Sequence, residues 1–147
     1  MKIVLILNVF STLLMVGLIW FVQVVHYPMF KDVGADGFVR YMQIHQRRTT
    51  WVVAPLMLIE AFSSVGLLYL RPPETDAIWL WGSMILVLVI WLSTAVLQVP
   101  KHGALAETGF SRRVHSGLVV TNWLRTVAWT CRGLILASIL WRLIPGD

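Results

Sequence analysis

The sequence has few charges and almost no cysteine, and both shortages restrict what the protein can be. Only 13% of its 147 residues are charged and 58% are hydrophobic, whereas about a quarter of the residues in a soluble domain are charged. A soluble fold of this length could not keep so much apolar surface away from water. Cys131 is the single cysteine, which excludes an intrachain disulfide and a cysteine zinc cluster. The class of protein that remains is an integral membrane protein.

Four long apolar segments predict that the chain crosses a bilayer four times. A helix needs roughly 20 apolar residues to cross the hydrocarbon core, and residues 3–25, 51–70, 78–99 and 118–143 provide such segments. The first follows Lys2 as a signal peptide would, but no small-residue cleavage pattern follows it, so we expect it to be retained. The expected fold is an all-α bundle of four transmembrane helices, forming a single domain over residues 1–147.

Tryptophans and basic residues give this bundle an orientation. Tryptophans typical of an aromatic belt lie at both boundaries: Trp20, Trp51 and Trp123 at one, and Trp79, Trp81 and Trp141 at the other. The connections after the first and third spans hold seven basic residues, namely Lys31, Arg40, Arg47, Arg48, Lys101, Arg112 and Arg113. The opposite side holds Lys2, Arg71 and Arg142. The positive-inside rule therefore predicts a bacterial inner-membrane protein with both termini outside.

The net charge of +5 indicates a membrane partner. The basic residues flank apolar runs and form no separate patch, so we expect a lipid bilayer and no nucleic acid as the partner. A homo-oligomer stays an open alternative.

Sliding the sequence on itself by 72 residues brings similar features into register. Pro28 aligns with Pro100, each just after an odd-numbered span, and Trp51 aligns with Trp123. The matches favour two tandem helical hairpins, residues 1–72 and 73–147, forming a parallel repeat about an axis along the membrane normal. The alternative is that any two membrane hairpins look alike.

Two charged residues lie deep inside the predicted spans. Glu60 and Arg132 are each nine residues inside a boundary tryptophan, which places both about 13 Å deep at a rise of about 1.5 Å per residue. Because an isolated charge at that depth costs a few kcal/mol or more, we expect an ion pair between the second and fourth spans. The pair either only locks two helices together or sets the field beneath a ligand site.

Further polar residues gather toward the cytoplasmic end of the spans. Polar side chains on the fourth span recur along one helical face, which must turn into the bundle. The candidates for a ligand site at that end are His26, His45, Gln98, His102, His115, Asn122 and Arg125. The four histidines could bind haem or a metal ion, although no HExxH, CxxC or other named metal motif is present. The alternative is that these histidines are only solvated at the membrane interface.

Local motifs add a resemblance that covers most of the chain. The runs QVPKHGALAETGF and NWLRTVAWTCRG, together with VHYPMF and PLMLIE, resemble a family of small bacterial four-span membrane proteins that implies no particular activity. More distantly, the chain is similar to the anthrone oxygenase-like membrane proteins, which oxidise polycyclic anthrones with molecular oxygen. His102 stands where those proteins often have asparagine, so the chain departs from their pattern at this position.

Two functions are therefore expected from the sequence. The first is the binding of a small apolar or aromatic molecule, or of a cofactor, at the cytoplasmic half of the bundle, with oxidoreductase activity as its extension. The alternative is a transport, accessory or structural membrane component without catalysis. Whether the protein is an enzyme stays open at this point.

The predicted topology can be tested with reporter fusions. A reporter active only in the periplasm should be active when it is fused after Asp147 and inactive when it is fused near Gly109, because seven basic residues hold the two long connections in the cytoplasm. Activity at Gly109 and none at Asp147 would contradict this orientation.

Overall fold

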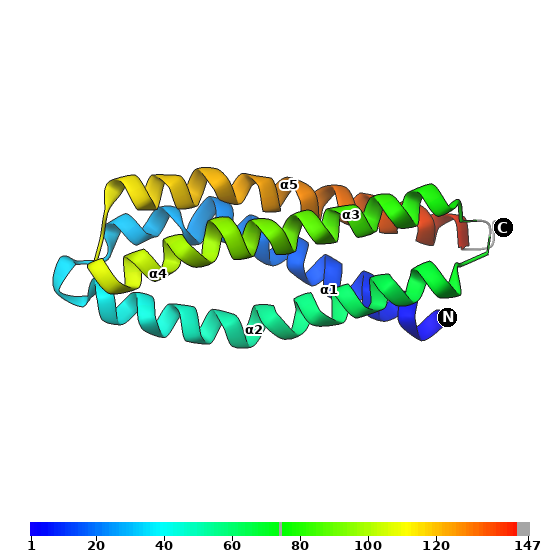
Figure 1. Ribbon diagram of the computed structural model, residues 1–147, viewed down its shortest axis with the longest axis horizontal. Coiled ribbons are helices and arrows are strands. Elements are labelled where there is room, and N and C mark those ends of the chain that lie inside the picture. Colours follow the sequence, from blue (N-terminus) through cyan, green and yellow to red (C-terminus); the bar gives the residue numbers. More distant parts are fainter. Residues whose placement is uncertain (74, 144–147) are drawn as a thin grey trace.

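Four helical rods lie side by side along the long axis of the molecule (Figure 1). The computed structural model describes residues 1–73 and 75–143, and all the elements in those residues are helices. The rods are formed by α1 (Lys2–Phe21) with η1 (Val22–His26) and η2 (Pro28–Asp32); by α2 (Ala35–Leu70); by α3 (Ala77–Ser93) with η3 (Thr94–Gln98) and α4 (Val99–Thr108); and by α5 (Arg112–Leu143). The start of α1 and the end of α5 lie at the same end of the bundle (Figure 1).

Three of the rods in the described residues are long and apolar enough to cross a membrane. They are the helical stretches Lys2–Asp32, Ala35–Leu70 and Ala77–Thr108. Their outward side chains are largely apolar and exposed, as in Phe10, Phe62 and Leu88. The prediction of a helical membrane protein is confirmed at this level.

The fourth rod, α5, differs from the other three in composition. With 32 residues it is long enough to span a bilayer, but it falls short of the apolarity that marks the other three rods. The reason is that it carries Asn122, Arg125 and Arg132, and all three of these side chains are buried inside the bundle.

The two connections expected on the cytoplasmic side are mostly helical. Helix α2 runs without interruption for 36 residues, about 54 Å at the usual rise, so it extends well beyond a hydrocarbon core of about 30 Å. Helix α4 likewise continues the third rod, and Gly109 then turns the chain into α5 with a φ of 85°. A positive φ of this kind favours glycine, which has no Cβ.

Each of two rods contains a widened π-helical turn directly before a proline. In η1 the Tyr27 N–H donates to the Val22 carbonyl, and in η3 the Val99 N–H donates to the Thr94 carbonyl. Pro28 and Pro100 follow, and proline lacks an N–H and clashes with the carbonyl four residues earlier. A π turn can accommodate such a break in the helical hydrogen bonding, and π turns often lie at functional sites. Here it sets the directions of Gln23, His26 and Gln98.

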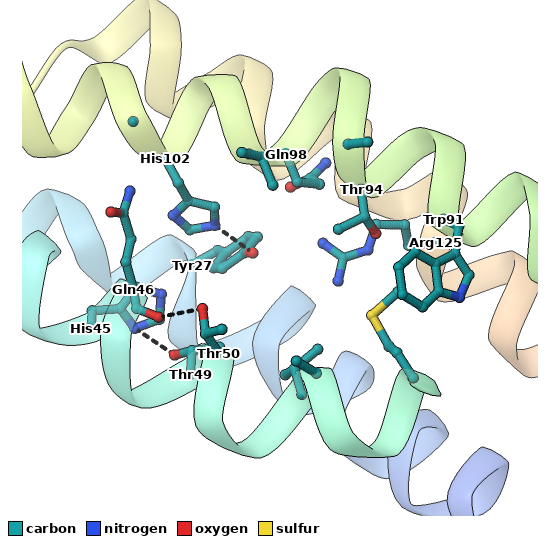
Figure 2. Close-up of a pocket in the computed structure, with 16 residues that line it drawn as sticks. Tyr27, His45, Gln46, Thr49, Thr50, Trp91, Thr94, Gln98, His102 and Arg125 are labelled. Atoms are coloured by element: carbon teal, nitrogen blue, oxygen red, sulfur yellow. Dashed lines mark hydrogen bonds between the residues drawn. The ribbon is translucent and has the colours of Figure 1, made fainter. Parts of the chain in front are cut away.

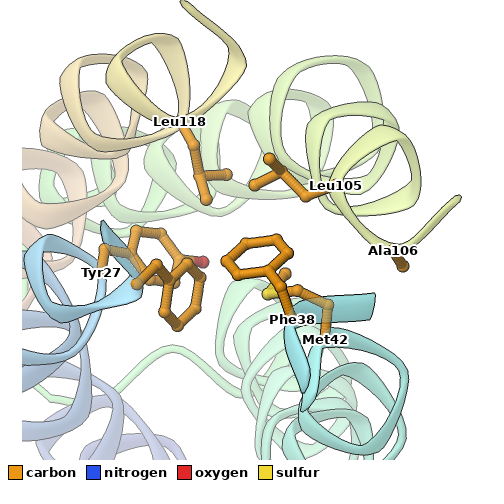
Figure 3. Close-up of a cluster of buried hydrophobic side chains, with 7 residues drawn as sticks. Tyr27, Phe38, Met42, Leu105, Ala106 and Leu118 are labelled. Carbon is orange, nitrogen blue, oxygen red and sulfur yellow. The ribbon is translucent and has the colours of Figure 1, made fainter. Parts of the chain in front are cut away.

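Buried apolar side chains of the described residues form three clusters, one after another along the bundle. The cluster nearest the η2–α2 and α4–α5 connections contains Tyr27, Phe30, Phe38, Met42, Leu105, Ala106 and Leu118 (Figure 3). A middle cluster surrounds Met57 and Trp129, and a third surrounds Leu67 and Leu136 toward the other end. These contacts join all four rods, so the bundle has a continuous apolar interior interrupted by polar groups at defined depths.

The principal interruption is the ion pair between Glu60 on α2 and Arg132 on α5. Arg132 Nε lies 2.8 Å from Glu60 Oε1, and both side chains are fully buried. This is the contact expected from their equal depths below Trp51 and Trp123.

The remaining donors of Arg132 are also used. Its Nη1 atom donates to the Ser83 carbonyl at 3.0 Å, and its Nη2 atom donates to Asn8 Oδ1 at 3.0 Å and to Ser64 Oγ at 2.8 Å. Helices α1, α2 and α3 therefore each provide an acceptor for one side chain of α5.

The carboxylate of Glu60 is equally well satisfied. Thr12 Oγ1 donates to Oε1 at 2.8 Å, and Trp129 Nε1 donates to Oε2 at 3.0 Å. Burial of a charge is tolerated when it is both paired and hydrogen-bonded. We call this group the polar layer; it comprises Asn8, Thr12, Glu60, Ser64, Ser83, Trp129 and Arg132.

Loss of either charge should strand its partner in the middle of the bundle. Glu60→Gln and Arg132→Gln should each reduce the free energy of unfolding by about 3–5 kcal/mol, because an uncompensated buried charge remains. The double variant should lose less than the sum of the two single losses, measured by thermal unfolding in detergent. Glu107→Gln, at an exposed carboxylate, is the matched control, and strict additivity would contradict the coupling.

Candidate functional site

A cavity of about 480 Å³ lies between α2 and the rod formed by α3, η3 and α4 (Figure 2). Its α2 wall runs from His45 to Met57 and its opposite wall from Trp91 to Gly103. These limits place it where the apolar part of each rod meets its polar extension. Apolar side chains and threonines make up most of the wall. The cavity also receives Tyr27 from the first rod and Arg125 from α5.

The structure brings four of the sequence-predicted residues together in this cavity. His45, Gln98, His102 and Arg125 all line it, although they come from α2, η3, α4 and α5. Figure 2 shows the Arg125 guanidinium directed into the space, with Gln98 and Trp91 close to it.

Three other predicted residues lie outside this cavity. His115 Nε2 is 2.8 Å from the Tyr27 carbonyl oxygen, and Asn122 Nδ2 donates to Gln23 Oε1 at 2.8 Å. Both side chains are buried and join α5 to the first rod, so their contacts are structural. His26 instead lines a smaller cavity of about 270 Å³ between the first rod and α2. The expectation that Asn122 lines one cavity with His45, His102 and Arg125 is therefore corrected.

Tyr27 is a site residue that the sequence analysis did not propose. Its hydroxyl lies 2.8 Å from His102 Nε2, and its ring lies in the cluster shown in Figure 3. The residue follows the widened turn η1 and precedes Pro28, so its direction depends on a backbone irregularity that no side-chain periodicity reveals. Its place in the motif VHYPMF was the one available signal.

Three histidines form a line from the small cavity to the large one. His26 Nε2 lies 3.1 Å from His45 Nδ1, and the His45 and His102 rings are 5.4 Å apart between centroids. His45 Nδ1 is also 3.2 Å from Thr49 Oγ1. An N···N hydrogen bond needs one donor and one acceptor, so at least one ring of the His26–His45 pair is neutral. The His26–His45 and Tyr27–His102 contacts thus lie close together beside the cavity wall.

Several polar atoms at the cavity wall have no partner among the described residues. These atoms are Gln98 Oε1, His102 Nδ1 and Arg125 Nε. The other side of Gln98 is used, since its Nε2 donates to Thr121 Oγ1 at 3.1 Å. Native proteins satisfy nearly all buried polar atoms with protein or water partners. These three atoms are covered by their surroundings, so the polar group that faces the cavity most directly is the guanidinium of Arg125 (Figure 2).

Arg125 is the strongest of these groups. Its side chain is 6% exposed, and its guanidinium carbon lies 5.2 Å from the centre of the Trp129 ring. No carboxylate in residues 1–73 and 75–143 pairs with it, because the one ion pair there joins Glu60 to Arg132. The Tyr27 hydroxyl is close enough to interact with the guanidinium, but a neutral phenol leaves the positive charge uncompensated.

The described residues contain no group of three or more metal-ligating side chains close enough to hold an ion. His26 and His45 are adjacent, whereas His102 is engaged by Tyr27 and His115 by the Tyr27 carbonyl. The four predicted histidines therefore do not form one ligand set.

No protein-family model, no curated protein and no solved structure matches the chain. Function must therefore be inferred from the geometry of the cavity and its surroundings.

The structural and cavity-lining polar residues should respond differently to mutation. Asn122→Ala should lower the free energy of unfolding by about 1–3 kcal/mol, because the buried Gln23 oxygen loses its close donor. His102→Ala should cost about 1 kcal/mol or less, because water can enter the partly open cavity and bond to Tyr27. Thermal unfolding in detergent measures both. A His102 variant as unstable as the Asn122 variant would contradict this division of roles.

Proposed function

We propose that the protein is a four-span inner-membrane protein that binds a small apolar or aromatic molecule in the cavity between α2 and α3. The observation that carries the proposal is the cavity itself: a largely apolar space of about 480 Å³ that is also lined by the polar side chains of His45, His102 and Arg125. An apolar pocket with a few convergent polar groups is the usual form of a small-molecule site.

The proposal treats α5 as the fourth span. Its buried side includes Arg125 and Arg132, and its outward side is apolar at every seventh residue. Val120, Val127, Leu134 and Trp141 are 65%, 55%, 67% and 79% exposed. Such a side-chain pattern suits contact with lipid, because both arginines are buried inside the bundle and neither faces the lipid.

The proposed architecture is two tandem hairpins related by an approximate twofold axis along the membrane normal. Residues 72 positions apart meet each other, as residues near such an axis must. Phe38 contacts Phe110 with ring centroids 5.4 Å apart, and Glu60 pairs with Arg132. The widened turns η1 and η3 are also separated by 72 residues. These contacts support the parallel repeat.

In this arrangement the cavity belongs to the cytoplasmic half of the membrane. The end that carries η2, α4 and the start of α5 also carries Lys31, Lys101 and Arg112, which the positive-inside rule assigns to the cytoplasm. The termini then lie outside.

Binding is favoured over transport by the packing below the cavity. A path across the membrane would have to pass the polar layer, where Glu60 and Arg132 are fully buried and held by neighbours from every long helix. The cavity has an opening but no continuation through this layer, as a binding site requires and a channel does not.

An oxidoreductase reaction on the bound molecule is the second candidate. The Tyr27–His102 hydrogen bond and the adjacent His45 ring supply groups that exchange protons at the cavity wall. The resemblance to anthrone oxygenase-like proteins points in the same direction, toward an aromatic substrate.

A cavity-filling variant tests the binding proposal. 6-Bromo-2-naphthol, added to protein in lipid nanodiscs, should quench tryptophan fluorescence saturably, because Trp91 lines the cavity. Ala54→Phe places a ring inside the cavity and should weaken binding at least about tenfold, or about 1.4 kcal/mol.

Leu58→Phe is the matched control. Leu58 lies one helical turn further along α2, is 45% exposed and does not line the cavity, so its variant should bind as the unchanged protein does. Equal affinities for the two phenylalanine variants, or quenching without saturation, would refute the site.

A further inference from the structure

The two arginines buried in α5 differ in one respect that identifies a ligand class. Arg132 has a carboxylate partner and acceptors from three helices. Arg125 lies seven residues away on the same face, is 6% exposed, and has no carboxylate partner in the part of the chain described. A buried charge without a counter-charge is strongly unfavourable. Binding of an anion next to Arg125 would therefore be favourable.

No acidic side chain of the cavity wall can compensate the charge of Arg125. None of the residues that line either cavity is acidic. The nearest carboxylate along the interior, Glu60, is committed to Arg132, Thr12 and Trp129. Asp32, Asp36 and Glu107 are exposed near the end of the bundle. No carboxylate of the described residues thus compensates the charge of Arg125, and a bound anion could do so from the cavity.

The rest of the cavity wall indicates what kind of body carries the anionic group of the ligand. Val53, Ala54, Met57, Ala95 and Val99 give most of the wall an apolar surface, which would exclude a small hydrated anion from favourable contact. The rim includes Thr50, Trp91, Ala95 and Val99, all of them exposed on the outside of the bundle. In a bilayer this rim opens toward lipid near the interface marked by Trp51. An apolar body can enter and remain there while a charged group reaches inward.

We infer that the ligand is an anionic amphiphile: a molecule with one carboxylate-type oxygen anion bound at Arg125 and an apolar body held between α2 and α3. This rests on the proposed binding function and specifies its ligand class. His102 also lines the cavity, and its Nε2 lies 2.8 Å from the Tyr27 hydroxyl. Arg48, which lines the smaller cavity together with His45, adds a positive charge that attracts anions to this end of the bundle.

A matched pair of probes separates charge from shape. 6-Bromo-2-naphthoate and 6-bromo-2-naphthol share the same ring and bromine, but at pH 7 only the first is an anion. Binding is measured by saturable quenching of tryptophan fluorescence in nanodiscs of uncharged phosphatidylcholine. The naphthoate should bind at least tenfold more tightly than the naphthol, the ratio expected for one charge-assisted hydrogen bond.

Arg125→Met should abolish this preference. The naphthoate should lose at least tenfold in affinity, and the naphthol should lose less than the naphthoate does, because it carries no charge for Arg125 to pair with. Arg125→Lys, which keeps the positive charge, should retain a preference for the anion. The melting temperature of ligand-free Arg125→Met should stay the same or rise, because a strained charge is removed, whereas the matched Arg132→Met should lower it by breaking an ion pair. If Arg125→Met fails to fold, the role of Arg125 is structural and the inference is overturned.

The outcomes distinguish failure of this inference from failure of the binding proposal. Equal affinity for the two probes in the unchanged protein overturns the anionic ligand but leaves the cavity as an apolar site. Displacement of the naphthoate by acetate at similar concentrations overturns the amphiphile, since it shows that a small soluble anion suffices. Absence of saturable quenching by either probe overturns both the inference and the proposed function.

Discussion

The fully satisfied Glu60–Arg132 pair is the contact on which the rest of the structure depends. Its two charges lie among helices whose outward faces are apolar, and neither can reach water. Acceptors and donors from α1, α2, α3 and α5 surround the pair, so the rotation of each long helix about its own axis is fixed by a hydrogen bond at one depth. Rotation of α2 or α5 would break the ion pair, and rotation of α1 or α3 would remove one of its hydrogen-bond partners. The polar layer thus sets which faces look inward, including the face of α5 that presents Arg125 to the cavity.

In the proposed repeat, the cavity lies where the two halves of the bundle differ. Position 125 carries arginine and the position 72 residues earlier carries Val53, and both side chains line the same space. On the other side of the bundle, the groove between α5 and the first rod is filled by the Gln23–Asn122 hydrogen bond and the contact of His115 with the Tyr27 carbonyl. In the described residues no side-chain hydrogen bond joins α2 to α3, and Gln98 of η3 bonds to Thr121 of α5 instead. The groove between α5 and the first rod is thus closed by structural contacts. The groove between α2 and α3 stays open, with the charge of Arg125 at its inner end.

The sequence predicted the helical rods, the common end of the termini, the Glu60–Arg132 contact, and the gathering of His45, Gln98, His102 and Arg125. These features follow from the length of apolar runs, from depth along a helix, and from the cost of polar groups in lipid.

The sequence did not predict which polar side chains would form hydrogen bonds with one another inside the bundle. Asn122 and His115 lie on the same polar face of α5 as Arg125. Helical periodicity predicts that shared face, but it does not predict which neighbour each side chain contacts. Tyr27 was missed because the π turn before Pro28 rotates it in a way that a regular helix would not. The connections between the apolar stretches are largely helical, since α2 and α4 extend their rods beyond those stretches.

The central claim is that an anion with an apolar body occupies the space between α2 and α3. Photolabelling tests it most directly, because the label reports where the probe lies rather than how strongly it binds. 4-[3-(Trifluoromethyl)-3H-diazirin-3-yl]benzoate, activated in nanodiscs containing the protein and mapped by peptide mass spectrometry, should modify residues within 45–57 and 91–103. An excess of 6-bromo-2-naphthoate should prevent that modification. Labelling spread over the exposed faces of α1 and α5, unaffected by the competitor, would contradict the account.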